Sequence, residues 1–241
     1  MNLQNLFNNW AKATAGQYDD QQWLLSKWDI LDGVVWPEEK VGILLDHIRE
    51  GLALTGSGCL LDLGCGGGWL LDRLSDSADR AIGCDISREM LKNARPGLTL
   101  LNADACCLPF KDSSCDRVLC YFVFINFMDL NDVEKAVGEI LRVLRPGGRA
   151  FIGQLPDRSQ SRVYDAEKER YTAYCERRFK IKANNSAVHA IPIQLFDKAF
   201  FMELLSKSEC SYQFSPSFNP FYREGEPSVI DWRFDIVIEK I

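Results

Sequence analysis

Apolar runs of strand length alternate with segments of helical periodicity along most of the chain. Short apolar runs bounded by turn residues are typical of buried strands, and apolar residues three and four positions apart indicate helices. The expected strands are 59–63, 80–85, 98–103, 116–123, 149–155, 210–218 and 232–240. The expected helices are 67–76, 87–94, 132–144 and 195–208. Between residues 58 and 154 this alternation predicts βαβ units and hence a parallel sheet.

Two regions lie outside the alternation. Residues 1–56 carry four tryptophans and have the pattern of two or three amphipathic helices. Residues 156–195 form an insertion, with a polar helix expected at about 160–180. Because the chain has 241 residues and is 46% hydrophobic, it is long enough to bury one core. We expect one domain overall, with a helical cap segment at 1–56 and a main α/β domain at 57–241 that contains the insertion.

A glycine-rich loop follows the first expected strand in the segment LLDLGCGGG. A strand that runs through glycines into a helix brings several backbone N–H groups to one point without side chains in the way. The pattern G-x-G-x-G holds at Gly64, Gly66 and Gly68, with Cys65 between the first two. The dinucleotide pattern G-x-G-x-x-G fails, because Trp69 stands at its last position.

An aspartate lies at the end of each of three expected neighbouring strands. These residues are Asp62, Asp85 and Asp104, and open α/β sheets bind ligands at this edge. Asp85 is placed to accept hydrogen bonds from both hydroxyls of a ribose. Asp104 and the N–H of Ala105 could read an adenine edge, and Asp62 could hold a cationic group. A single aspartate here is as readily a helix cap or turn residue, but three together favour a binding site.

With these elements the sequence resembles the class I S-adenosylmethionine-dependent methyltransferases. The resemblance rests on LLDLGCGGG (60–68), GCDIS (83–87), NADACCLPF (102–110), CDRVLCYFVFINFMD (115–129) and EILRVLRPGGRAFI (139–152). It implies a Rossmann-like seven-stranded sheet of order 3-2-1-4-5-7-6, with an antiparallel last strand and helices on both faces.

The same resemblance implies S-adenosylmethionine as the cofactor and S-adenosylhomocysteine as its product. The implied contacts are Asp62 and Gly64 with the methionine part, Asp85 with the ribose, Asp104 and Ala105 with the adenine, and Ile86 and Leu108 beside its ring. The loop residues Cys65, Gly66 and Gly68 complete the implied cofactor-binding set.

S-adenosylmethionine carries its own electrophile, so the protein has to align the acceptor and exclude water. We expect direct in-line transfer of the methyl group to an O or N atom of a small-molecule acceptor. Many small-molecule members of the family carry a pair of His near Ile125 and Asn126, and its absence here puts a fixed base at that site in doubt. Asn126 could orient the acceptor by hydrogen bonding. Tyr121, with Phe122, could line the sulfonium pocket, although both also fit an ordinary strand-end core.

His189, in the insertion, is the remaining candidate base, although it also fits a plain loop residue. His47 lies in the helical pattern of residues 38–52 and fits a surface or hydrogen-bonded helix residue better than a base. We expect the first 36 residues and the insertion helix to enclose the acceptor pocket.

The composition disfavours several classes of function and site. Net charge is −6, from 28 basic and 34 acidic residues, and this disfavours a general nucleic-acid binder, which needs clustered Lys and Arg. The nine cysteines include no CxxC pair with zinc spacing, so we expect free thiols, a reducing cytoplasmic compartment and no metal site. We expect no leader peptide and no membrane span, because no apolar run reaches about 18 residues. Oligomeric state cannot be inferred from the sequence.

Three other classes of protein share part of this sequence pattern. A methyltransferase acting on RNA or protein would keep the fold and change the partner. A non-catalytic S-adenosylmethionine-binding protein would keep only the cofactor. A nicotinamide or flavin oxidoreductase would share the glycine loop and Asp85, but Trp69, Asp104 and the Pro-Gly-Gly element count against it.

Overall fold

A computed structural model of the chain describes residues 3–14, 38–163, 165–166, 169, 193–218 and 229–241. Its strands are β1 (Cys59–Leu63), β2 (Arg80–Asp85), β3 (Thr99–Asn102), β4 (Cys115–Tyr121), β5 (Leu144–Pro156), β6 (Cys210–Phe218) and β7 (Val229–Lys240). The helices are α1 (Leu3–Thr14), α3 (Glu38–Leu52), α4 (Trp69–Leu74), α5 (Arg88–Lys92), α6 (Leu130–Val143) and α8 (Lys198–Ser206). Three short 3-10 turns are η1 (Ser75–Ser77), η2 (Phe124–Asn126) and η3 (Arg158–Gln160).

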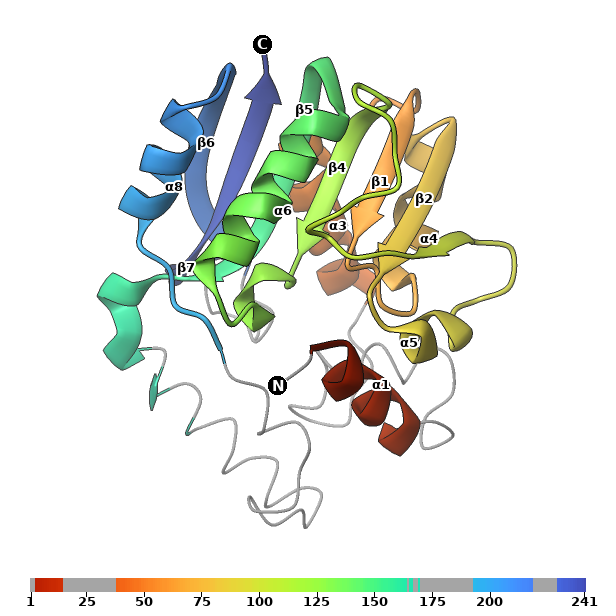
Figure 1. Ribbon diagram of the computed structural model, residues 1–241, viewed down its shortest axis with the longest axis horizontal. Coiled ribbons are helices and arrows are strands. Elements are labelled where there is room, and N and C mark those ends of the chain that lie inside the picture. The colour runs from red at the N-terminus through yellow and green to blue at the C-terminus, as the bar shows by residue number, and fades with distance from the viewer. Residues whose placement is uncertain (1–2, 15–37, 164, 167–168, 170–192, 219–228) are drawn as a thin grey trace.

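The strands form one sheet in the order β3-β2-β1-β4-β5-β7-β6. Strands β1 to β5 pair in parallel, and β7 runs antiparallel to both β5 and β6. The predicted order and the antiparallel last strand are confirmed. Because parallel strands point the same way, the loops after β1, β2, β3 and β4 all begin at the carboxyl ends of the strands. This side of the sheet, called its carboxyl edge below, faces α1 and α5 in Figure 1.

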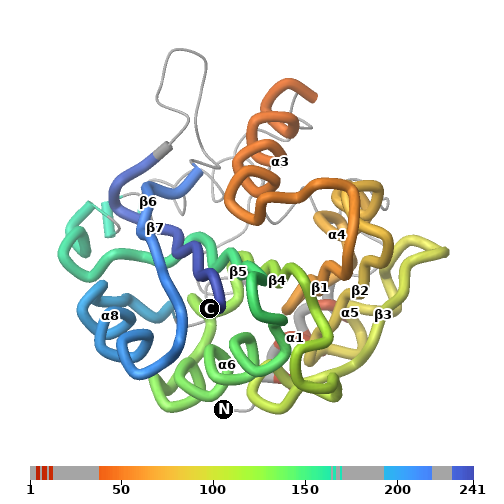
Figure 2. The backbone as a smooth tube through the Cα atoms, turned by 90° about the horizontal axis from the view of Figure 1, so that it is seen from above, coloured from red at the N-terminus to blue at the C-terminus, as the bar shows by residue number. Residues whose placement is uncertain are grey.

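Helices cover the sheet on both faces, with α3 and α4 on one side and α6 and α8 on the other (Figure 2). Neighbouring residues of β1 point to opposite faces: Leu60 packs with the α3 side and Leu61 with the α6 side, and neither is exposed. Such burial on both faces explains why the central strands have continuous apolar sequences instead of alternating apolar and polar residues.

Helix α6 shows how the local sequence sets an element. Its N-cap is Asp129, whose carboxylate accepts from the N–H of Asn131 at 2.9 Å. An apolar stripe then faces the sheet, formed by Val133, Ala136, Val137, Ile140 and Val143. The predicted start of the helix, residue 132, lies two positions late because Asp129 and Asn131 are polar and Leu130 lies outside the apolar stripe.

The strand after α6 begins earlier than predicted. We expected residues 149–155, and β5 starts at Leu144, which pairs with Cys115 at the start of β4. A register shift between Cys115 and Arg117 accommodates the intervening Pro-Gly-Gly segment. Tertiary pairing therefore extends the strand through residues that the sequence marks as a turn.

Other boundaries agree within a few residues. The predicted helix 67–76 is divided into α4 and η1. Ser87, the first residue of the predicted helix 87–94, caps α5 by accepting from the N–H of Met90 at 3.2 Å. Most of the predicted insertion helix at about 160–180 lies outside the described residues. No helix in the part of the chain that the structure describes is long and apolar enough to cross a membrane.

Two glycine-to-alanine substitutions test the packing around β2 and α6. One should destabilise the protein, and the other should stabilise it. A Cβ at Gly83 in β2 would lie 2.8 Å from Cys65 Sγ and 2.9 Å from Leu71 Cδ2, whereas one at Gly138 in α6 meets nothing within 4 Å. Gly83→Ala should therefore lower the free energy of unfolding by about 1–3 kcal/mol. Gly138→Ala should raise it by about 0.5–1 kcal/mol through helix propensity. Urea unfolding of both variants checks the pair, and a Gly83→Ala protein as stable as the parent would contradict the described packing.

Candidate functional site

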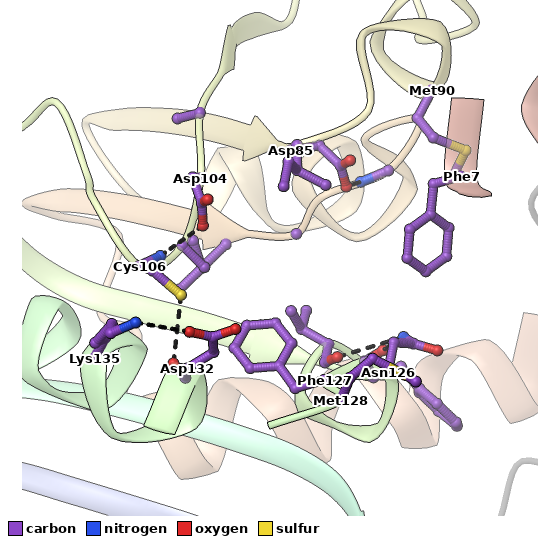
Figure 3. Close-up of a pocket in the computed structure, with 18 residues that line it drawn as sticks. Phe7, Asp85, Met90, Asp104, Cys106, Asn126, Phe127, Met128, Asp132 and Lys135 are labelled. Atoms are coloured by element: carbon purple, nitrogen blue, oxygen red, sulfur yellow. Dashed lines mark hydrogen bonds and ion pairs between the residues drawn. The ribbon is translucent and has the colours of Figure 1, made fainter. Parts of the chain in front are cut away.

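A cavity of about 670 Å³ opens at the carboxyl edge of the sheet, within the size range of small-molecule sites. Its walls come from the ends of β1, β2, β3 and β4, from the turn η2 and from the first turns of α6. Helices α1 and α5 complete it, and Figure 3 shows side chains from all these elements around one space. The cavity therefore lies at the carboxyl ends of the parallel strands, where the loops that follow them begin.

Asp85 holds two loops together at this edge. Its Oδ2 accepts from the N–H of Gly66 at 2.9 Å, and its Oδ1 accepts from the N–H of Ser87 at 2.7 Å. One carboxylate thus fixes both the glycine loop after β1 and the start of α5. Asp85 also lines the cavity.

The glycine loop requires glycine at the positions nearest the cavity. Gly64 has a φ of 75°, and a Cβ there would collide with the side chain of Val123. Gly66 has a φ of 57°, and a Cβ there would lie 3.1 Å from the Met90 side chain. The backbone of the loop is thereby left open to a ligand, and both glycines line the cavity.

Asp62 lies beneath the glycine loop and is only 3% exposed. Burial, and then the charge of Asp85, raise the pKa of this carboxyl to about 7. Its Oδ2 meets no hydrogen-bond partner among the described residues. A buried carboxylate oxygen without a partner is costly, so this atom is suited to a cationic or hydrogen-bonding ligand group.

The neighbouring thiols of Cys65, Cys84 and Cys120 remain protonated. Burial raises the pKa of each, and the charge of Asp62 adds to the shift. Asp62 is therefore the group in this cluster that titrates near neutral pH.

The end of the cavity beyond β3 is acidic. Asp104 Oδ1 accepts from the N–H of Cys106 at 2.9 Å, which shapes the turn that contains Ala105. Asp132, in the first turn of α6, pairs with Lys135 at 2.9 Å on the same wall (Figure 3). Asp104 and Ala105 both line the cavity.

The opposite wall is apolar except for one amide. Phe122, Val123, Phe127 and Met128 line it, and Asn126 stands among them. Asn126 donates through Nδ2 to the carbonyl oxygens of Phe122 at 3.0 Å and Val123 at 3.4 Å. These two bonds fix the orientation of the amide and leave its Oδ1 as the group that can accept a hydrogen bond from a ligand.

Tyr121 lies beneath this wall and is not among the cavity-lining residues. Its ring stacks on Phe151 on the α3 side of the sheet, and its hydroxyl accepts from Gln154 Nε2 at 3.1 Å. Burial raises its pKa well above the ordinary tyrosine value. The next residue, Phe122, follows the end of β4 with a φ of 61°; it lines the cavity, and its ring meets that of Tyr121 edge-on.

The cavity brings together most of the residues singled out from the sequence. Those that line it are Gly64, Gly66, Asp85, Ile86, Asp104, Ala105, Phe122 and Asn126. Five others do not line it and are buried, namely Asp62, Cys65, Gly68, Leu108 and Tyr121, and His189 lies outside the described residues.

Several lining residues carried no clear signal in the sequence. Phe7 and Met90 belong to α1 and α5, and only folding shows that these helices meet. Asp132 and Lys135 could have been anticipated, because a helix that follows β4 must begin at the same edge as the other loops.

Comparison with known proteins identifies the domain. Residues 61–152 match the family model described as a methyltransferase domain. A demethylmenaquinone methyltransferase from Thermus thermophilus is 42% identical over 106 residues, which cover 40% of this chain and 47% of that protein. A tRNA (carboxymethyluridine(34)-5-O)-methyltransferase from Arabidopsis thaliana is 35% identical over 118 residues, covering 48% and 27%. The chain thus spans about half, or less, of the length of the curated relatives it matches.

Solved structures support the same fold. A Thermotoga maritima structure described as an S-adenosylmethionine-dependent methyltransferase, possible histamine N-methyltransferase, has a TM-score of 0.60 and 19% identity. The similarity covers 99% of both chains. With the strand order, this shows that the chain has the fold of that methyltransferase structure, and residues 61–152 match the family model of a methyltransferase domain.

Proposed function

We propose that the protein transfers a methyl group from S-adenosylmethionine to an O or N atom of a small-molecule acceptor by direct in-line displacement. The observation that carries this proposal is the division of one cavity into an acidic end, at Asp85 and Asp104, and an apolar end with a single oriented amide, at Asn126. The acidic end suits the cofactor, and the apolar end suits an organic acceptor.

The residues at the acidic end fit the cofactor. The unpartnered Oδ2 of Asp62 suits the amino group of its methionine part, and the bare loop at Gly64 and Gly66 leaves room for that part. Asp85 is the proposed ribose ligand, while Asp104 and Ala105 are the proposed adenine ligands. When bound, S-adenosylmethionine supplies a methyl group on a positively charged sulfur.

The apolar end indicates what this chain contributes to the reaction. Phe122, Val123 and Phe127 exclude water from the space beside the glycine loop. Asn126 Oδ1 accepts a hydrogen bond from the acceptor's O–H or N–H and so orients its lone pair. An amide cannot take up a proton, so Asn126 orients the acceptor without acting as a base.

A tRNA acceptor is the second candidate, because the Arabidopsis relative carries such a name. The net charge of −6 and the acidic rim at Asp104 and Asp132 count against a polyanionic partner. A third possibility is a protein that binds the cofactor without transferring its methyl group.

The pKa of Asp62 predicts how cofactor binding depends on pH. Below pH 7 this carboxyl is protonated and cannot pair with the amino group of S-adenosylhomocysteine. The Kd of S-adenosylhomocysteine should therefore fall about tenfold between pH 6 and pH 8. Asp62→Asn should bind more weakly at pH 8 and lose this dependence. Calorimetric titration at both pH values measures it, and a parent Kd independent of pH would contradict the role of Asp62.

The same shift has a consequence for stability. Between about pH 4 and pH 7 the folded, ligand-free protein keeps a proton on Asp62 that the unfolded chain has lost. The contribution of Asp62 to the free energy of unfolding therefore falls as the pH rises through this window. Asp62→Asn should lack this pH dependence, because an asparagine does not titrate.

Substitution of Asn126 tests the acceptor end. Asn126→Ala should lower kcat/KM for the acceptor about tenfold or more, since an oriented hydrogen bond is lost, and should leave the Kd of S-adenosylhomocysteine unchanged. Asn131→Ala is the matched control, because Asn131 is an exposed asparagine that does not line the cavity.

The acceptor class can be screened with methyl-labelled S-adenosylmethionine and three probes: 2-naphthol, histamine and bulk tRNA. We expect label on a small molecule. Label on tRNA alone would replace the small-molecule proposal. Binding of the cofactor with no transfer to any probe would favour the non-catalytic alternative.

A further inference from the structure

Helix α1 lies across the carboxyl edge of the sheet, next to α5 (Figure 1). Its Phe7 side chain reaches the cavity beside Met90 and close to Asp85 (Figure 3). The part of the cavity that α1 covers is thus the end with the proposed ribose ligand. We expected residues 1–36 and the insertion helix to enclose the acceptor end; residues 15–36 and most of that helix lie outside the described residues.

A short chain of hydrogen bonds holds α1 to this end. Asn8 Oδ1 accepts from Ser87 Oγ at 2.8 Å and from the N–H of Glu89 at 3.3 Å. Gln4 Nε2 donates to the carbonyl oxygen of Ile86 at 3.2 Å. Asn8 therefore binds the N-cap residue of α5, whose own N–H donates to Asp85.

The helix depends on this contact for its order. A helix of 12 residues is marginal in water by itself, so α1 gains its stability from docking. Ala11 is fully buried in the docked position, and Asn9 lies on the exposed side of the helix.

We infer that α1 is a wall of the cofactor pocket whose docking is coupled to binding of the nucleoside part of the cofactor. Phe7 is a binding residue that packs against the nucleoside, and Asn8 is a positioning residue that holds Phe7 there through Ser87. The inference rests on the proposed function, because it takes the ligand at Asp85 to be S-adenosylmethionine or its product.

Coupling of this kind is reciprocal. If the docked helix strengthens nucleoside binding by some factor, then the bound nucleoside strengthens docking of the helix by the same factor. Affinity and helix protection must therefore change together, which a purely structural role of α1 does not require.

Affinity is tested by calorimetric titration of the full chain with S-adenosylhomocysteine. Phe7→Ala should raise the Kd about tenfold, as expected for loss of a buried aromatic contact. Asn8→Ala should raise it in the same direction, and Asn9→Ala, the matched control on the same helix, should leave it unchanged. Equal Kd values for the parent, Phe7→Ala and Asn8→Ala would overturn the inference.

Helix docking is tested by hydrogen exchange of residues 3–14 with and without ligand. S-adenosylhomocysteine should slow their exchange in the parent and slow it less in Asn8→Ala. Adenosine alone should also protect them, and methionine alone should not. Protection by methionine, or none by S-adenosylhomocysteine, would overturn the inference.

The two proposals fail in distinguishable ways. If the parent protein does not bind S-adenosylhomocysteine, the proposed function fails and takes this inference with it. If it binds equally well in all variants, the function stands and only the role of α1 is rejected.

Discussion

The site depends on the two backbone hydrogen bonds that Asp85 accepts. With one oxygen it holds Gly66 in the loop after β1, and with the other it holds Ser87 at the start of α5. Ser87 in turn caps α5 and donates to Asn8 of α1. Because charged acceptors make the stronger hydrogen bonds, one carboxylate sets the geometry of three neighbouring segments.

The same charge sets the electrostatics beneath the loop. Asp62 is buried close to Asp85, and both burial and the neighbouring charge oppose its ionisation. A cation bound beside Asp62 would relieve this cost. The free-energy cost of ionising the buried Asp62 carboxyl is therefore linked to ligand binding. Ionisable groups with shifted pKa values of this kind are common at functional sites.

A polar cluster inside the fold lies behind the apolar end of the cavity. Asp235, which is fully buried, accepts from Ser217 Oγ and from the N–H of Gln154 and pairs with His47 at 2.7 Å. Gln154 also contacts Arg233, whose guanidinium lies 5.0 Å from the ring of Phe122. His47 is therefore a hydrogen-bonded residue of the α3 face, and the cluster supports the backbone from which Phe122 turns into the cavity.

Local pattern in the sequence determined most of the architecture. Apolar runs placed the strands, Ser87 lay at a predicted helix start, and the resemblance to a family supplied the strand order that the local pattern leaves open. The glycines and the aspartates after β1, β2 and β3 marked the site, because parallel strands must end at one edge. Only the tertiary structure decided that Tyr121 points to the core, that Asp85 joins two loops and that Phe7 closes the cavity. These features arise from contacts between residues far apart in the chain, which no local periodicity encodes.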